Sequence, residues 1–135
     1  MKEITKVVVD AMGGDNAPHE IIKGAVEAVG KSDAIHVILV GKEDVINQEL
    51  SGYTYNKEQI SVVHTSEVIE TAEPPVMAIR RKKDSSIVVG LKMVKDKEAD
   101  AFVSAGSSGA VLAGGQLLVG RIKGCLLYTS PSPRD

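Results

Sequence analysis

Near the N-terminus, residues 7–18 read VVVDAMGGDNAP, and three patterns follow one another in this stretch. The three consecutive valines form a continuous apolar run, which is typical of a strand buried on both faces. A turn with two adjacent glycines comes next, and Pro18 then suits the first turn of a helix. The stretch therefore predicts a buried strand that passes through a tight turn into a helix.

The same alternation of short apolar runs and longer amphipathic stretches continues along the chain. Further strands are predicted at residues 35–40, 60–64 and 101–104. Helices are predicted at residues 18–29, 42–50, 76–81, 85–95 and 109–120, with Gly30 as the stop signal of the first. Because strands that alternate with helices pair in parallel, the sequence predicts an α/β fold. We expect an open, mostly parallel sheet with helices on both faces, and four strands are few for a complete sheet of this kind.

Composition narrows the range of functions. The chain has 135 residues, a net charge of -2 and 3% aromatic residues. We do not expect nucleic-acid binding, because that function relies on a basic surface or on aromatic rings that stack on bases. A single cysteine, Cys125, cannot form an internal disulfide or a cysteine-based zinc site. Neither a signal peptide nor a membrane span is predicted, so we expect a cytoplasmic protein with at most peripheral membrane contact.

Residues 125–135 read CLLYTSPSPRD and break the alternation. This peptide matches the translation of a transposase adapter used in preparing sequencing libraries, so we interpret it as a non-native tail. The alternative is a short disordered C-terminus. On the first interpretation, residues 1–124 are the natural part, and the domain continues beyond Gly124.

The turn after the first strand is a candidate anion site. Gly13 and Gly14 let a ligand approach the backbone closely, and the helix that follows offers free N–H groups. These two glycines and Asn16 are candidates for direct contact with a phosphate or carboxylate. Asp10 and Asp15 would orient the loop, because carboxylates repel phosphate. The alternative is a tight turn in which Asp15 or Asn16 caps the helix and no ligand binds.

A second turn at residues 104–109 reads SAGSSG and has the same placement, after a strand and before a helix. Backbone N–H groups and serine hydroxyls in such a turn can surround an anion without a charged side chain. Its candidate contacts are Gly106, Ser107, Ser108 and Gly109. The alternative is again a capped turn without a ligand. If the two strands are neighbours in the sheet, both turns would form one anion site.

The strongest local cluster of charge consists of Arg80, Arg81, Lys82 and Lys83. Such a run is typical of a solvated helix end, and it also suits a docking patch for an acidic partner. His19 lies beside the first turn and is a further candidate for ligand contact. His36 and His64 fall within predicted strands, where a structural role is expected, and the spacing of the three histidines matches no common metal motif.

These segments together resemble the bacterial phosphate acyltransferase family, PlsX. The most specific motif is VVDAMGGDNAP at residues 8–18. Supporting motifs are EPP at residues 73–75, the basic run followed by DSS at residues 84–86, ADAFVSAG at residues 99–106 and GRIKG at residues 120–124. The resemblance spans residues 1–124, which correspond to the N-terminal part of the family's chain. The second turn departs from the SAGNTG that is common in the family: serine keeps the hydroxyl of the threonine, but the asparagine amide is missing.

The resemblance implies a three-layer α/β/α fold like that of isopropylmalate dehydrogenase. It also implies an acyltransferase that moves a fatty acyl group from acyl-ACP to inorganic phosphate and so feeds phospholipid synthesis. Such an enzyme would be a homodimer with peripheral membrane contact, would need no metal or redox cofactor, and could dock the acidic carrier on the basic run. Its catalytic residues are unknown and are expected beyond Gly124, so residues 1–124 alone should be inactive.

Three other functions remain open. A phosphotransacetylase-like enzyme would use a CoA thioester in place of acyl-ACP. A non-catalytic module would bind phosphate without turning anything over. A dehydrogenase is less favoured, because the first turn matches neither the GxGxxG nor the P-loop pattern. A hydrolase is not favoured either, since GSSGA at residues 106–110 lacks the last glycine of the GxSxG elbow.

Overall fold

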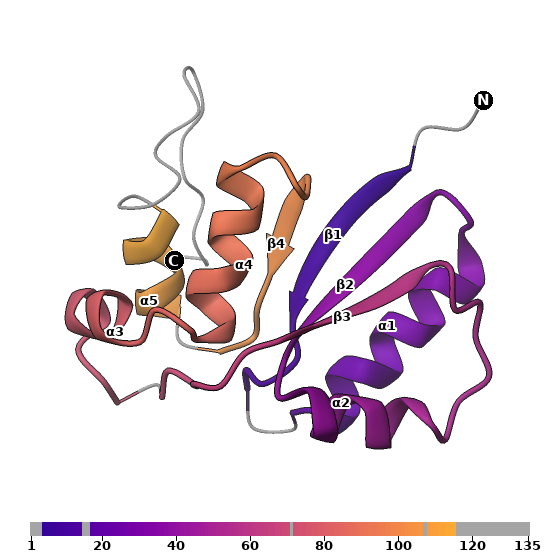
Figure 1. Cartoon of the computed structure of the whole chain (residues 1–135), viewed down its shortest axis with the longest axis horizontal. Helices are drawn as coiled ribbons and strands as arrows, with labels where there is room; N and C mark the ends of the chain where they lie inside the picture. The colour runs from indigo at the N-terminus through magenta and orange to yellow at the C-terminus, as the bar shows by residue number, and fades with distance from the viewer. Residues whose placement is uncertain (1–3, 15–16, 71, 107, 116–135) are drawn as a thin grey trace, which may run out of the picture.

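Four parallel strands form one sheet in the order β3-β2-β1-β4 (Figure 1). The computed structural model describes residues 4–14, 17–70, 72–106 and 108–115. The strands are β1 (Thr5–Asp10), β2 (Ile35–Gly41), β3 (Ile60–His64) and β4 (Ala101–Val103). The predicted α/β fold with a parallel sheet is therefore confirmed.

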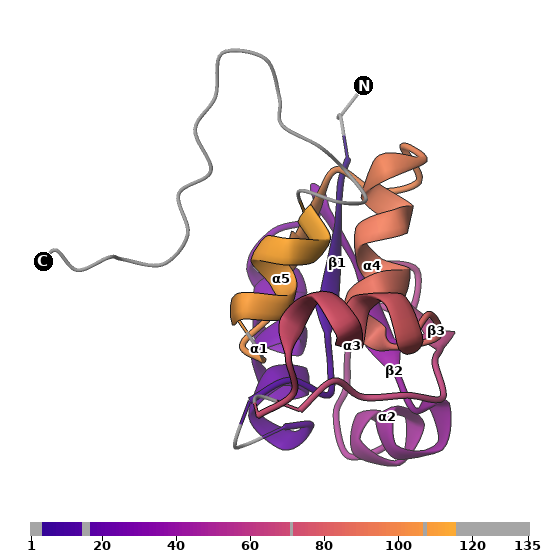
Figure 2. The same ribbon diagram turned by 90° about the vertical axis from the view of Figure 1, so that its left-hand side faces the viewer.

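Helices cover both faces of this sheet (Figures 1 and 2). They are α1 (His19–Lys31), α2 (Glu43–Leu50), α3 (Pro75–Arg81), α4 (Ser86–Lys95) and α5 (Ser108–Gly114). The helices α1 and α2 pack on one face, and α4 packs on the other. The short helix α5 contacts both α3 and α4, so these three helices form one layer.

One predicted helix end differs in the structure, and another lies outside the described residues. The prediction that the first helix stops at Gly30 is wrong, because α1 continues to Lys31 and Ser32 takes the C-cap position. A glycine ends a helix when the chain needs left-handed backbone, and Gly30 has no positive φ. Of the helix predicted at residues 109–120, residues 116–120 lie outside the described part of the chain, as does the predicted tail at residues 125–135.

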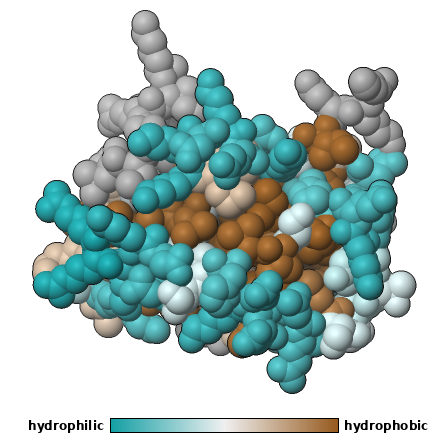
Figure 3. All heavy atoms as spheres, viewed as in Figure 1, coloured by the Kyte–Doolittle hydropathy of each residue, from teal (hydrophilic) through white to brown (hydrophobic). Residues whose placement is uncertain are grey.

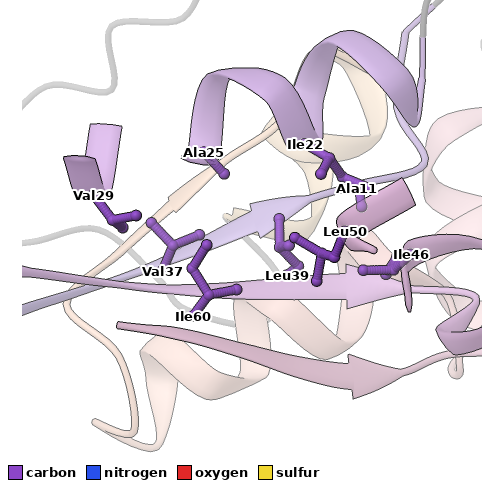
Figure 4. Close-up of a cluster of buried hydrophobic side chains, with 9 residues drawn as sticks. All are labelled: Ala11, Ile22, Ala25, Val29, Val37, Leu39, Ile46, Leu50 and Ile60. Atoms are coloured by element: carbon purple, nitrogen blue, oxygen red, sulfur yellow. The ribbon is translucent and has the colours of Figure 1, made fainter. Parts of the chain in front are cut away.

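The side chains of β1 alternate between the two faces of the sheet. Val9 joins the core under α1 and α2, whereas Val8 belongs to the core on the α4 side. Figure 4 shows the first of these cores, which consists of Ala11, Ile22, Ala25, Val29, Val37, Leu39, Ile46, Leu50 and Ile60. Because successive strand residues point to opposite faces, the valine run contributes to both cores, and the side chain of Asp10 points to the α4 side.

The strand order reverses at β1. From β1 the chain proceeds outward through β2 to β3, and it then returns to place β4 on the other side of β1. In open parallel sheets, ligands bind beyond the carboxyl ends of the strands at the point where the order reverses. That point lies between the ends of β1 and β4, where the two glycine-rich turns begin.

The described residues leave part of the sheet uncovered. An open groove of about 400 Å³ runs between α1 and the sheet, and Val103 on the edge strand β4 is 54% exposed. The groove is lined by Val7, Val9, Glu20, Ile21, Gly24, Ala25, Ala28, Ile35, Val37 and Val103. Hydrophobic residues also gather in the middle of the face seen in Figure 3, within a hydrophilic rim. Within the described residues, no helix is long and apolar enough to cross a bilayer.

Two helical glycines offer a matched test of the packing beneath α4. A Cβ on Gly90 would overlap the ring of Phe102 on β4, whereas a Cβ on Gly24 of α1 would meet nothing within 4 Å. We expect Gly90→Ala to lower the free energy of unfolding by about 1–3 kcal/mol despite its better helix propensity. Gly24→Ala should raise it by roughly 0.5–1 kcal/mol. Urea unfolding followed by circular dichroism measures both, and shifts of the same sign would contradict this packing.

Candidate functional site

The carboxylate of Asp10, at the end of β1, joins three segments of the chain. Its Oδ1 accepts hydrogen bonds from the hydroxyl of Ser86 at 2.6 Å and from the N–H of Met12 at 2.9 Å. Its Oδ2 accepts one from the hydroxyl of Ser104 at 2.8 Å. Asp10 is only 2% exposed. A carboxylate can be buried where donors satisfy it, and each hydrogen bond to a charged group contributes about 1.5–3 kcal/mol.

The position of Ser86 follows from the way in which α4 begins. Ser85 is the N-cap residue, and its hydroxyl accepts a hydrogen bond from the N–H of Val88 at 3.2 Å. Ser86 is therefore the first residue of the helix, and it is 1% exposed. Since α4 packs on the face to which Asp10 points, the hydroxyl of Ser86 reaches the carboxylate.

The second hydroxyl comes from the neighbouring strand. β1 pairs with β4 so that Val9 lies opposite Val103. The next residue of each strand segment, Asp10 and Ser104, therefore lies at the same edge of the sheet, and their side chains bond to each other. The condition for one shared anion site, that the two turns follow neighbouring strands, is met.

The two glycine-rich turns touch each other above this carboxylate. A Cβ on Gly13 would lie 2.7 Å from the backbone N of Gly106 and 2.7 Å from Oδ2 of Asp10. Gly14 has a φ of 92°, in the left-handed region that favours glycine, and a Cβ there would lie 3.2 Å from Ala105. Only a glycine fits at position 13, because any side chain would force the turns apart.

Hydrogen bonding within the turns leaves a small set of donors for a ligand. The N–H of Gly106 donates to the hydroxyl of Ser104 at 3.0 Å, so it serves the turn itself. Among the described residues, the N–H groups of Gly13 and Gly14 have no hydrogen-bond partner. Adjacent backbone N–H groups of this kind suit an anion.

Three predicted site residues cannot be placed. Asp15, Asn16 and Ser107 lie outside the described residues. The N-cap position of α1 is occupied by Pro18, which has no side-chain capping bond. The prediction that Asp15 or Asn16 takes the N-cap position is therefore wrong, whereas the alternative of a turn that binds no ligand stays open.

Ser108 and Gly109 form the first turn of α5. A Cβ on Gly109 would lie 2.8 Å from Cγ of Pro75, the first residue of α3. The start of α3 is thus packed directly against the second glycine-rich turn. This contact brings the helix that carries the basic run next to the candidate site.

The basic run spans the end of α3 and the connection to α4. Its exposed members are Arg80, Arg81 and Lys83. Lys82 differs, because its Nζ donates to the carbonyl of Val68 at 2.8 Å and to Oε2 of Glu73 at 2.6 Å. A hydrogen bond from the N–H of Glu70, together with the one from Lys82, holds the pKa of Glu73 below its usual value. The four cations of the run therefore differ in availability, because Lys82 is already hydrogen-bonded within the protein.

Each histidine has a local partner. Nδ1 of His19 lies 3.0 Å from a carboxylate oxygen of Glu49 on α2. His36 bonds to the hydroxyl of Ser61 on the neighbouring strand at 2.7 Å. His64 accepts a hydrogen bond from the first N–H of α2 at 3.1 Å. The two strand histidines thus have the structural role that their positions predicted.

Sequence reasoning did not identify Ser86 or Ser104 as parts of the site. The DSS motif at residues 84–86 signals a helix N-cap, but it does not indicate that the serine after the cap faces Asp10. Ser104 opens the second turn, but nothing in the sequence of that turn indicates that its hydroxyl donates to Asp10. Both roles depend on which strands are neighbours.

Comparison with known proteins agrees with the motifs. A family model described as "Fatty acid synthesis protein" matches residues 5–127. The chain is 60% identical over 119 residues to a phosphate acyltransferase of Alkaliphilus oremlandii (strain OhILAs), an alignment that covers 88% of this chain and 35% of the relative. For the phosphate acyltransferase of Clostridium novyi (strain NT) the identity is 57%, with 88% and 36% covered. For that of Clostridioides difficile (strain 630) it is 48% over 131 residues, with 94% and 38% covered.

The chain therefore spans 35–38% of the length of these relatives. The family model, by contrast, covers nearly all of this chain, including both glycine-rich turns and the basic run. The resemblance drawn from residues 8–18 and the supporting motifs is confirmed. The chain belongs to the family of fatty acid synthesis proteins that includes the phosphate acyltransferases.

Proposed function

We propose that the protein to which this chain belongs transfers a fatty acyl group from acyl-ACP to inorganic phosphate. The acyl phosphate would then enter phospholipid synthesis. One observation carries the proposal: two glycine-rich turns meet over a buried carboxylate at the point where the strand order reverses. Membership of a family that includes phosphate acyltransferases supports this reaction over other uses of an anion site.

The reaction requires a well-aligned and partly dehydrated phosphate. One phosphate oxygen attacks the carbonyl carbon of the thioester, and the C–S bond then breaks. The phosphate loses its proton and the departing thiolate gains one, so that the products are an acyl phosphate and the carrier thiol. Neutral backbone donors suit this task, because they hold the anion in place without a cation that would weaken the attacking oxygen.

The described residues have distinct roles in this proposal. The N–H groups of Gly13 and Gly14, which have no partner among the described residues, bind phosphate. Gly106 lets the second turn approach them closely. Asp10 does not touch the phosphate, because both of its oxygens already accept hydrogen bonds. Gly109 lets Pro75, at the start of α3, pack against the second turn. Further candidate contacts are Asn16, Ser107 and Ser108, with Asp15 as a second loop-orienting residue.

The acyl carrier is proposed to dock on α3. Three cations of the basic run are exposed and form no ion pair with other described residues: Arg80, Arg81 and Lys83. The same helix exposes 43% of Val76 and 45% of Met77. An acidic carrier would find cations and apolar contacts there, beside the turn that Pro75 packs against. Lys82 is left out of this patch, since it is bonded to Glu73. Homodimer formation and peripheral membrane contact stay predictions.

The activity can be tested in a complete protein. Residues 1–124 would replace the aligned part of the Alkaliphilus oremlandii relative, and the chimera would be assayed for acyl phosphate. We expect product from long-chain acyl-ACP and phosphate, and none from residues 1–124 alone. Faster turnover of acetyl-CoA would instead identify a phosphotransacetylase-like enzyme. Phosphate binding without turnover of either thioester would identify a non-catalytic module.

A change at Gly13 tests whether the two turns form the phosphate site. In the chimera, Gly13→Ala places a methyl group 2.7 Å from the backbone of the second turn, so the turns must separate. Since a displacement of 1 Å can cost about 100-fold, we expect kcat/KM for phosphate to fall by about that factor. The KM for acyl-ACP should stay within about twofold. Gly24→Ala is the control, and a normal phosphate dependence of Gly13→Ala would remove this turn from the site.

A charge-reversal pair tests the docking patch. Arg80→Glu with Arg81→Glu changes two exposed cations on α3, and we expect the KM for acyl-ACP to rise about tenfold, an effect that diminishes with added salt. The matched control is Lys31→Glu with Lys57→Glu, which changes two exposed cations at the opposite, amino-terminal edge of the sheet. Equal effects of the two pairs on the KM for acyl-ACP would show that only net charge matters.

A further inference from the structure

We propose that Asp10, Ser86 and Ser104 form a positioning network that sets the distance between the two glycine-rich turns, and thereby the affinity for phosphate. Ser86 is the member that belongs to neither of the two strand ends nor their turns, because it lies in α4. The inference rests on the proposed function, since it assigns a role to the groups beneath the same phosphate site.

The network connects three elements of the domain, which are β1, β4 and α4. The ends of β1 and β4 carry the two turns, and α4 is a helix whose start is fixed by its Ser85 cap. Asp10 accepts from Ser86 on one oxygen and from Ser104 on the other, at 2.6 and 2.8 Å. Without Ser86, the carboxylate would keep only the bonds from its own turn and from β4. The hydroxyl of Ser86 therefore fixes both turns relative to the body of the domain.

The carboxylate of Asp10 lies close to one glycine of each turn, Gly13 and Gly106. Its Oδ2 is the atom that a Cβ on Gly13 would meet at 2.7 Å, and it lies 3.4 Å from the Cβ position of Gly106. A rotation of the Asp10 side chain must therefore displace one turn or the other. Because Gly13 carries one of the proposed phosphate donors, its backbone N–H, a shift of the carboxylate would be passed on to that donor.

The hydrogen bonds also have a defined direction. An ionised carboxylate only accepts, so the hydroxyl of Ser104 must donate to Asp10. The oxygen of Ser104 is then free to accept from the N–H of Gly106, at 3.0 Å. This chain of bonds draws the second turn down toward the carboxylate. Asp10 at 2% exposure and Ser86 at 1% cannot reach the ligand, so both act through the backbone of the turns.

Serine variants of the chimera test the network. We expect Ser86→Ala and Ser104→Ala each to raise the KM for phosphate at least about tenfold, because misplacement of the donors weakens their contact with the anion. The KM for acyl-ACP should stay within about twofold. Ser104→Thr keeps the hydroxyl and should restore the phosphate KM to near the wild-type value. Thr65→Val is the matched control, since the buried Thr65 hydroxyl has no hydrogen-bond partner among the described residues.

Two further measurements separate this inference from the proposed function. Urea unfolding of each variant reports stability, and calorimetry with inorganic phosphate reports binding without turnover. If Ser86→Ala and Ser104→Ala lower the unfolding midpoint but leave the phosphate KM and binding constant within twofold, the network is only structural and the inference is wrong. If the chimera makes no acyl phosphate but its phosphate binding weakens in both variants, the inference stands and the proposed reaction fails. If the unsubstituted chimera binds no phosphate, both fail.

Discussion

A carboxylate that is buried at the end of a parallel strand must find hydrogen-bond donors, and Asp10 finds them in segments 76 and 94 residues away in the chain. This requirement holds the start of α4 and the end of β4 against the end of β1. The contact between the two glycine-rich turns depends on it, since the same carboxylate oxygen packs under both. The geometry of the candidate site is thus a consequence of satisfying one buried charge.

The fold separates two kinds of electrostatics at one edge of the sheet. The proposed phosphate donors are neutral backbone N–H groups, and hydrogen bonds beneath them stabilise the negative charge of Asp10. The exposed cations of the basic run lie on α3 and in its connection to α4, next to the site but outside the turns. In the proposed function, attraction of an acidic carrier and positioning of phosphate would therefore use different groups, so that a change in one need not disturb the other.

Local patterns predicted most of the secondary structure correctly, and the exceptions have physical reasons. The strands at residues 35–40 and 60–64 follow from apolar runs, and the observed ranges differ by at most one residue. Gly30 did not stop its helix, because its backbone does not adopt the left-handed conformation and α1 continues through it to Lys31. The sequence alone does not distinguish the four cations of the basic run. In the structure, Lys82 donates hydrogen bonds to Glu73 and to a backbone carbonyl. That contact needs the loop before α3 to fold over the helix, which charge patterning does not reveal.

The sequence by itself determined the class of fold, the position of both glycine-rich turns and the family, since these depend on short-range periodicity and on residues adjacent in the chain. Only the tertiary structure decided that β1 and β4 are neighbours, that Ser86 faces Asp10, and that Gly13 touches Gly106. The reason is that strand order and helix placement are set by how apolar faces pack across the whole domain. A periodic pattern states which face of a strand is buried, but it does not state which distant segment buries it.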